Sequence, residues 1–330
     1  MLRTDRQAAL SGLSPKFLLL LAAALAPSAA HAQAWPAKPI RLIVPFTPAG
    51  GTDTSARIMA QAWSDDPGWR IVVENRPGAS GRIGTELAAK AAPDGYTLLL
   101  GSVAPNAILP SAVANLPYDA VRDFAPISLL ATSDFMLVVH PSLPARSVKD
   151  LLALARGRPG QINFASVGAI SGSHLTGELL TQLAKITMVH VAYKGPGAAV
   201  VAVLSGEASL YFGSGPTVVP HVNAGRLRAL ATTGAKRSRG FPNLPTVSET
   251  VPGHVSSQWF GFLAPAGTPK DIVAKVHEAI VAATARPRVA EQIAAVGADL
   301  VAGSPAEFSA FINAEITKWG RVVKSGVALE

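Results

Sequence analysis

Short apolar runs rich in β-branched residues alternate along the chain with longer segments whose apolar residues recur every three or four positions. The short runs are typical of buried strands, and the longer segments are typical of amphipathic helices. The alternation predicts an α/β protein with βαβ units and a largely parallel sheet. We expect strands at 40–44, 71–74, 97–101, 128–131, 136–140, 162–165, 188–192, 210–213, 227–232 and 259–264. We expect helices at 52–63, 84–91, 148–155, 172–183, 197–204, 216–224, 270–283, 287–296 and 305–325.

The last predicted helix shows the periodicity clearly. Its apolar residues are Phe308, Phe311, Ile312, Ile316 and Trp319, at helical spacing. Such a stripe is the usual pattern of a surface helix that buries one face against a core. We therefore assign these side chains to packing and not to a cofactor site.

No repeat and no low-complexity linker divides the chain into two independent halves. This continuity suggests domains that are interleaved by more than one chain crossing. The candidate crossings are 136–141 and 259–265, because both are extended, apolar and closed by a proline.

Composition narrows the class of protein. The chain has 330 residues, of which 49% are hydrophobic and 15% are charged. It is therefore long enough for about two packed domains, and disorder or a coiled coil is unexpected. The absence of cysteine excludes a disulfide scaffold, a thiolate metal site, a cysteine nucleophile and a lipidated bacterial N-terminus.

The first 32 residues have the pattern of an export signal. An apolar run over 17–26 follows the basic residues Arg3, Arg6 and Lys16. Small residues at a cleavage site are supplied by Ala30-His31-Ala32. Ten apolar residues are too few for the roughly 20 that span a bilayer. The pattern predicts a signal peptide over 1–32 that is removed from an exported protein.

The charge distribution favours small anions over nucleic acids. The formal net charge is +8, and the basic residues are scattered except for Lys236, Arg237 and Arg239. Little aromatic interleaving accompanies that cluster, so it makes no base-stacking platform. A positive field does favour anionic ligands.

A glycine loop follows the first predicted strand. Gly50 and Gly51 precede Thr52 and Asp53, which open a helix. Unpaired backbone N–H groups at a helix N-terminus, together with the helix dipole, favour an anion. The alternative is that Thr52 or Asp53 only caps the helix. For this loop alone both interpretations stay open.

A second loop of this kind follows the strand at 71–74. It contains Ala79, Ser80 and Gly81 and precedes another helix. At the carboxyl ends of neighbouring parallel strands, the two loops face one crevice, where open α/β sheets bind ligands. Donors from both loops suit a carboxylate. The glycine spacing matches neither a dinucleotide fingerprint nor a phosphate-binding P-loop.

A secreted hydrolase is the enzyme alternative. The chain has no G-x-S-x-G elbow, no H-E-x-x-H motif and no histidine pair at positions i and i+4. The glycine loops account for anion binding without a nucleophile. We expect no catalysis, no metal and no cofactor.

A set of short motifs, taken in order, resembles one family: the solute-binding receptors of tripartite tricarboxylate transporters, called Bug proteins. The likeness covers nearly the whole chain after the leader. The motifs that carry it are WPAKPI at 35–40, VPF at 44–46 with GGTD at 50–53, ENRPGA at 74–79, PDGYTL at 93–98, LPYD at 116–119 with DFAP at 123–126, HVAYKG at 190–195, and WFGF at 259–262 with APAGTP at 264–269.

The resemblance implies a periplasmic-binding-protein type II fold, in which two α/β domains are joined by two crossing segments and enclose a ligand cleft. We expect one domain over 33–138 plus 260–330 and the other over 139–259. The family implies a periplasmic, non-catalytic receptor that delivers an organic carboxylate to integral-membrane transporter subunits. A sensor that docks on a membrane signalling partner stays an alternative. We expect a monomer, since no heptad pattern or long edge strand is evident.

The ligand-binding residues follow from matching the family's motifs. The backbone of the first loop and the side chain of Thr52 or Asp53 are expected to meet one carboxylate, with the second loop closing from the other side. The second domain is expected to supply Ser166 and His174. The full expected set is Phe46, Pro48, Ala49, Gly50, Thr52, Asp53, Ala79, Ser80, Gly81, Ser102, Ser166, His174 and Gly213.

Two positions bear on ligand choice. Many relatives have Asp-Asn after an aromatic residue where this chain has Gly213-Ser214 after Phe212. The missing carboxylate argues against an amino-acid ligand, and Gly213 is expected to leave room in the cleft. Lys194 is either the partner of a second carboxylate or a solvated residue at the rim.

Overall fold

The computed structural model describes residues 35–48, 50–65, 67–238, 240–295 and 297–324. Within this part of the chain, the residues from Lys38 onward form one compact unit. The predicted signal peptide, residues 1–32, lies outside the described residues. In the described ranges, no helix has both the length and the apolar character needed to cross a membrane.

The strands form a mixed sheet with the order β2-β1-β3-β9-β4-β7-β5-β6, to which β8 and β10 add by pairing with β4. β1 is parallel to β2 and β3, and β5 is parallel to β6 and β7, while β4 and β9 run antiparallel to their neighbours. The strands are β1 (Ile40–Val44), β2 (Ile71–Asn75), β3 (Thr97–Ser102), β4 (Phe124–Val139), β5 (Asn163–Ser166), β6 (Val189–Ala192), β7 (Leu210–Ser214), β8 (Arg228–Thr232), β9 (Ser257–Pro265) and β10 (Asp299–Leu300).

The helices agree closely with the expected ranges. They are α2 (Gly51–Asp65), α3 (Arg82–Ala89), α4 (Leu109–Ala112), α5 (Val148–Gly157), α6 (Gly172–Ala184), α7 (Pro196–Leu204), α8 (Gly215–Asn223), α9 (Lys270–Thr284), α10 (Pro287–Ala295) and α11 (Pro305–Lys324). Short helical segments η1 (Ala79–Gly81), η2 (Ala104–Ile108) and η3 (Val247–Glu249) complete the set. Among these, α4 and the three short segments η1, η2 and η3 were not expected from the sequence.

One long strand replaces two expected ones. β4 is continuous where strands at 128–131 and 136–140 were expected, so that division was wrong. The polar residues between them stay in the ladder, because Ser133 pairs with Gln258 and Asp134 pairs with Ser257 of β9. The Ser133 hydroxyl also donates to the Gly297 carbonyl at 2.7 Å, which satisfies it inside the sheet.

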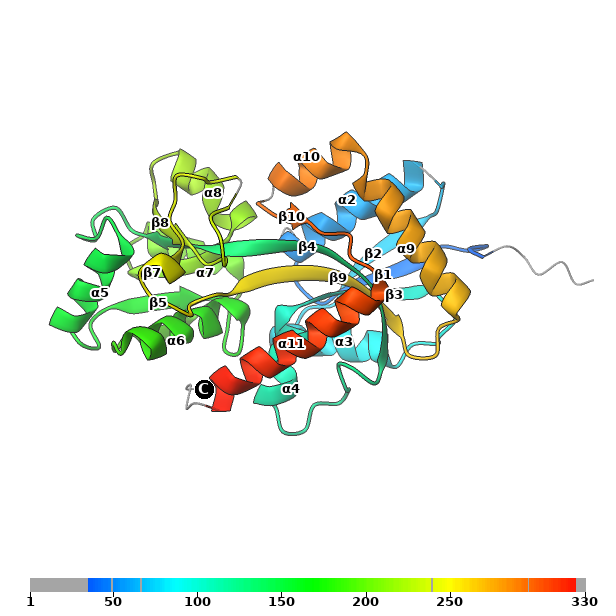
Figure 1. Ribbon diagram of the computed structural model, residues 1–330, viewed down its shortest axis with the longest axis horizontal. Helices are drawn as coiled ribbons and strands as arrows, with labels where there is room; N and C mark the ends of the chain where they lie inside the picture. Colours follow the sequence, from blue (N-terminus) through cyan, green and yellow to red (C-terminus); the bar gives the residue numbers. More distant parts are fainter. Residues whose placement is uncertain (1–34, 49, 66, 239, 296, 325–330) are drawn as a thin grey trace, which may run out of the picture. The chain divides into compact units, whose positions relative to one another are not determined.

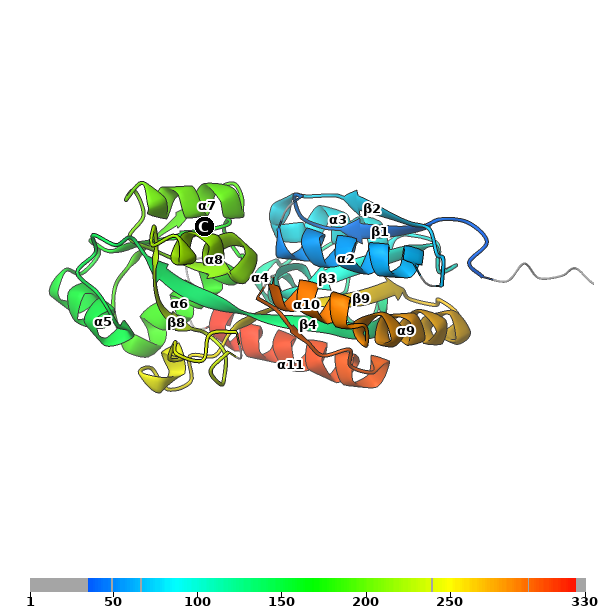
Figure 2. The ribbon, with the colours of Figure 1, turned by 90° about the horizontal axis from the view of Figure 1, so that it is seen from above.

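The partner of β4 changes along its length, and this change creates two lobes. Up to Asp134 the strand pairs with β9, and from Phe135 it pairs with β7. We call β1–β3 with α2, α3 and α9–α11 the first lobe, and β5–β8 with α5–α8 the second lobe. In Figures 1 and 2, β4 and β9 run from the first lobe toward the second as two neighbouring long strands. This arrangement confirms the expected fold class, while the exact boundaries at 138/139 and 259/260 remain predictions.

The first-lobe core gathers around α11, which lies along β4 and β9. Phe308, Ile312 and Trp319 are buried, as the apolar stripe indicated. Trp259 of β9 packs its ring edge to face against Phe308, with 5.7 Å between ring centroids. The helix also buries Glu315, whose Oε2 accepts a hydrogen bond from the Trp319 indole at 3.1 Å. This packing anchors the C-terminal helix on the strands that join the lobes.

Candidate ligand-binding site

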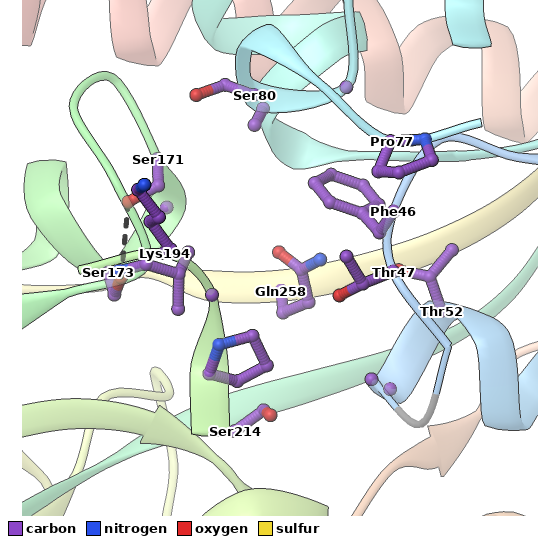
Figure 3. A pocket seen from close by; sticks show the side chains of 18 of the residues that line it. Phe46, Thr47, Thr52, Pro77, Ser80, Ser171, Ser173, Lys194, Ser214 and Gln258 are labelled. Carbon is purple, nitrogen blue, oxygen red and sulfur yellow. Dashed lines mark hydrogen bonds between the residues drawn. The ribbon is translucent and has the colours of Figure 1, made fainter. Parts of the chain in front are cut away.

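A cavity of about 440 Å³ lies at the carboxyl ends of the parallel strands of both lobes. Loops after β1 and β2 form one side, loops after β5 and β6 form the other, and Gln258 of β9 lies between them (Figure 3). The position is where open α/β sheets bind ligands. The lining residues are Phe46, Thr47, Gly50, Gly51, Thr52, Pro77, Gly78, Ala79, Ser80, Gly81, Ala104, Phe135, Val167, Ser171, Gly172, Ser173, Lys194, Gly195, Pro196, Tyr211, Ser214, Gln258 and Phe260.

Four helices direct their N-termini at this cavity. Helix α2 begins at Gly51, α6 begins at Gly172, and α7 begins at Pro196, and all three residues are in the lining. Helix α8 begins directly after Ser214, which also lines the cavity. The first N–H groups of a helix lack intrahelical partners and carry partial positive charge, so the four ends together favour an anion.

Lys194 is the charged side chain of the described lining, and no acidic side chain occurs in it. Figure 3 shows Lys194 on the second-lobe side, beside Ser171 and Ser173. Its ammonium group has no ion pair with a carboxylate among the described residues, and the residue is exposed. Among the described lining residues, the second-lobe side of the cavity therefore offers the Lys194 ammonium group and several hydroxyl groups.

Aromatic rings supply much of the remaining wall. Phe46, Phe135, Tyr211 and Phe260 all line the cavity, and the last three are buried. Burial raises the pKa of the Tyr211 phenol well above its usual range, so this side chain is neutral. Apolar walls exclude water from a bound ligand and strengthen its interaction with the helix ends.

The first loop is held by a network that includes Asp53. Asp53 is 2% exposed, and its carboxylate accepts hydrogen bonds from Arg57 Nε at 3.0 Å and from Asn75 Nδ2 at 2.9 Å. Asn75 Nδ2 also lies 3.0 Å from the Phe46 carbonyl oxygen. The carboxylate is therefore committed to holding the loop in place and does not line the cavity.

The second loop adopts an uncommon backbone conformation. Gly78, Ala79, Ser80 and Gly81 all have positive φ, with values of 132°, 48°, 54° and 91°. Positive φ is costly for residues with a Cβ, such as Ala79 and Ser80. The Ser80 hydroxyl donates to the carbonyl of Ala169 in the second lobe at 2.8 Å. A hydrogen bond thus joins the two lobes beside the cavity.

Ser166 and His174 lie behind the cavity wall. Ser166 Oγ is 2.6 Å from His190 Nε2, and the His190 ring stacks on the His174 ring with 3.7 Å between centroids. Burial and the neighbouring His174 lower the pKa of His190 to about 4, so the ring is neutral near pH 7. His174 Nδ1 accepts from the Ile170 N–H at 3.1 Å, which ties the ring to its own loop. Neither Ser166 nor His174 is in the lining.

The structure brings six of the thirteen expected residues into the lining: Phe46, Gly50, Thr52, Ala79, Ser80 and Gly81. Six others lie outside it: Pro48, Asp53, Ser102, Ser166, His174 and Gly213. Ala49 lies outside the described residues. Ser102 is fully buried, and its hydroxyl has no hydrogen-bond partner within the described ranges. Whether each of the thirteen contacts a ligand stays a prediction.

The interpretation that Gly213 opens space was wrong. A Cβ at this position would collide with Val218 and would lie 2.7 Å from Tyr211 Cε1. Glycine is therefore required by the packing of β7 against α8 and Tyr211. The neighbouring Ser214 lines the cavity instead.

The sequence reasoning missed several lining residues. Gln258 directly precedes the crossing expected at 259–265, and Phe135 directly precedes the one expected at 136–141 and lies where β4 changes partner. Ser171 and Ser173 carried a usable signal, because they open a helix directly after a glycine loop. No local pattern marks Gln258 or Phe135 as part of a ligand site.

Comparison with known proteins places this architecture in one family. Residues 55–327 match the family model described as "Tripartite tricarboxylate transporter family receptor". Protein BugT of Bordetella pertussis is 40% identical over 295 residues, which cover 89% of this chain and 90% of that protein. The structure of Rpa4515 of R. palustris with adipate superposes with a TM-score of 0.84 at 34% identity, covering 88% of this chain and 97% of that one.

A second solved structure agrees. MatC (Rpa3494) of Rhodopseudomonas palustris with bound malate gives a TM-score of 0.81 at 28% identity and covers 88% of this chain and 100% of that one. Its similarity, like that of the other two proteins, extends over both lobes. The chain belongs to the tripartite tricarboxylate transporter receptor family, whose members are solute-binding proteins and not enzymes.

Proposed function

We propose that this protein is a periplasmic receptor that binds a small organic carboxylate between its lobes and delivers it to a tripartite tricarboxylate-type membrane transporter. The observation that carries the proposal is the convergence of the α2, α6, α7 and α8 N-termini and Lys194 on one cavity. Each of these groups stabilises negative charge, and the described lining contains no acidic side chain that would oppose it.

The polar groups lie on two sides of the cavity, which favours a ligand with two carboxylates. The first-lobe side offers Thr52 and the start of α2, and the second-lobe side offers Lys194 and Ser173 (Figure 3). Aromatic walls between them suit a short hydrocarbon spacer. Two relatives in this family bind adipate and malate, which have this form. The described lining has no acidic partner for an ammonium group, which argues against an amino-acid ligand.

The location and the transport role rest on the family and on the leader pattern. Members of this family are receptors for a tripartite membrane transporter. The basic and apolar pattern of residues 1–32 supports export to the periplasm. A closed lobe pair around a ligand is the state that a membrane partner would recognise, because ligand binding shifts the balance between open and closed forms.

The binding step is tested on mature protein that has been unfolded, stripped of ligand and refolded. Thermal unfolding is followed with adipate, malate, their monoamides, aspartate and a neutral sugar. A ligand at a hundred times its Kd stabilises by about 2.7 kcal/mol, which raises Tm by several degrees. Stronger stabilisation by a dicarboxylate than by its monoamide supports the proposal. Stabilisation by the sugar or aspartate alone contradicts it.

The delivery step requires a separate experiment. The transporter subunits are reconstituted in vesicles, and uptake of the dicarboxylate that binds is measured with and without the receptor. Uptake that depends on added receptor supports delivery. Binding without receptor-dependent uptake would retain the carboxylate site and reject the transport role.

A further inference from the structure

Ser80 lies in the loop that was expected to meet the ligand, yet its hydroxyl is directed elsewhere. It donates to the Ala169 carbonyl at 2.8 Å, and the two residues belong to different lobes. Ser80 follows β2 in the first lobe, and Ala169 follows β5 in the second. Separation of the lobes about β4 and β9 would have to break this bond. We refer to it as the interlobe hydrogen bond.

The acceptor side of this bond is fixed by its neighbours. The Gly168 carbonyl accepts from Ser166 Oγ at 3.0 Å and from Ser171 Oγ at 2.6 Å. On the other side, the Ile170 N–H donates to His174 Nδ1 at 3.1 Å. Both peptide groups that flank Ala169 are therefore tied to the second lobe, which leaves the Ala169 carbonyl to face Ser80.

The same segment also packs against an apolar cluster that draws residues from both lobes. Ile170 packs against this cluster, which contains Val103 after β3 and Leu175 of α6. Ile170 has a φ of 58°, a conformation that is costly for a β-branched residue. Such conformations persist where surrounding contacts enforce them, and they concentrate at ligand clamps and switch regions. Strained residues thus occur on both sides of the interlobe hydrogen bond, at Ser80 and at Ile170.

We propose that Ser80 is a positioning residue that holds the lobes closed through Ala169, and that Ser166 and His174 support it by fixing the 168–171 loop. Ser80 therefore increases the affinity of any ligand that the closed cavity accepts, without selecting among ligands. His174 supports the loop through its Nδ1 atom, which accepts from the Ile170 N–H. The inference concerns closure and holds whichever anion the cavity takes.

The experiment uses the absence of cysteine from the chain. Cysteines introduced at the exposed positions Val281 in α9 of the first lobe and Val201 in α7 of the second carry a donor and an acceptor fluorophore. Single-molecule energy transfer then measures the closed fraction without ligand and with adipate. Ser80→Ala is compared with Ser205→Ala, whose hydroxyl donates to Ala202 within α7.

Loss of one hydrogen bond of ordinary strength should lower the closed-to-open ratio by about fivefold in Ser80→Ala. Ser205→Ala should match the parent protein. For ligands that bind, the dissociation rate should rise by the same factor for each of them, since closure is common to all. An unchanged closed-to-open ratio in Ser80→Ala, both with and without adipate, would overturn the proposal. A loss of affinity confined to one ligand would also overturn it, because it would indicate direct contact.

His174 provides an independent test on the acceptor side. His174→Asn places an amide oxygen near the position of Nδ1 and should retain more of the closed state than His174→Leu. The double variant Ser80→Ala/His174→Leu should lower the closed-to-open ratio by less than the product of the two single-variant factors, since both changes break the same contact. Fully multiplicative effects would show that His174 does not act through the loop. Thermal unfolding of each variant verifies that it is folded.

Discussion

The carboxamide nitrogen of Asn75 lies 2.9 Å from the Asp53 carboxylate, at the end of β2 and within the first turn of α2. The same nitrogen is 3.0 Å from the Phe46 carbonyl oxygen. One side chain therefore fixes both ends of the loop between β1 and α2. The loop places Thr52 and the N-terminus of α2 at the cavity.

Replacing Asn75 by Ala should therefore weaken ligand binding and lower stability together. The change leaves the buried Asp53 carboxylate without one of its donors, which should cost about 1–3 kcal/mol. Chemical denaturation and calorimetric titration with the identified carboxylate measure the two effects. Gln61→Ala is the control, because it removes a hydrogen bond to Asp65 on the exposed face of the same helix. Equal behaviour of the two variants would contradict this role of Asn75.

A pair of glycine substitutions tests the packing of the second lobe. Gly177 lies inside α6, and a Cβ there would meet the Phe164 ring, with 2.6 Å to Cδ2. Gly177→Ala should therefore destabilise by about 1–3 kcal/mol, the usual effect of overpacking. Gly157, in the last turn of α5, has no heavy atom within 4 Å of its Cβ position. Gly157→Ala should stabilise by about 0.5 kcal/mol through helix propensity.

Denaturant unfolding curves of the two glycine variants measure these changes directly. The sign of the difference is the decisive quantity, since both substitutions add one methyl group to a helix. Destabilisation by both would mean that the end of α5 is more constrained than its open surroundings indicate.

Lys194 is the next position to test, because it is the cation of the described lining. Lys194→Met keeps the length of the side chain and removes its charge. Affinity for a dicarboxylate should fall by about tenfold, the usual range for a hydrogen bond to a charged group. Affinity for the monoamide that lacks the second charge should change little. Lys149→Met, on the exposed face of α5, controls for the change in net charge.

Calorimetric titration at two salt concentrations provides the readout for Lys194. The parent protein should lose affinity at high salt, and Lys194→Met should lose less, because screening acts on the removed charge. If Lys194→Met reduced affinity equally for the dicarboxylate and the monoamide, Lys194 would lie at the solvated rim and would not pair with the second carboxylate.

The sequence predicted most elements because their patterns are local. The mainly apolar run at 40–44, interrupted only by Arg41, indicated β1, and the glycine loop after it indicated the start of α2 at the site. The two-residue strand β10 was missed, since so short a segment has no periodicity of its own. β4 was divided because Ser133 and Asp134 resemble a break, whereas pairing with β9 keeps them extended.

The candidate site was harder to predict than the fold. Residue types at strand ends identified loops that line the cavity, but contacts distant in sequence determine where each side chain points. Asp53 meets Asn75 across 22 positions, and Ser80 meets Ala169 across 89. Three of the expected ligand residues, Asp53, Ser166 and His174, each have a polar atom engaged in a hydrogen bond within the protein and do not line the cavity. Sequence pattern alone does not distinguish such a support from a residue that lines the cavity.

Asp134 predicts a pH dependence of stability. It lies at the end of the β4–β9 ladder, and burial together with the negative charge of Asp299 raises its pKa to about 6, from an ordinary value of 3.8. At pH values between 3.8 and about 6, Asp134 keeps its proton in the folded protein but releases it in the unfolded chain. This contribution to stability is therefore greatest at low pH and is lost as pH rises from about 4 to 6, by on the order of 2–3 kcal/mol.

Asp134→Asn removes this titration and should be more stable than the parent protein at pH 7, with the difference vanishing near pH 4. His190 titrates in the opposite sense. Because its pKa is lowered to about 4, its contribution is lost as pH falls from 6.5. That histidine is present in both proteins, so the difference between their unfolding free energies isolates Asp134. Urea denaturation at half-unit steps from pH 4 to 7 measures it. Parallel plots of unfolding free energy against pH for the parent protein and Asp134→Asn would contradict the assignment. Asp299→Asn should lower the pKa of Asp134 only in part, since burial is the larger cause of its rise.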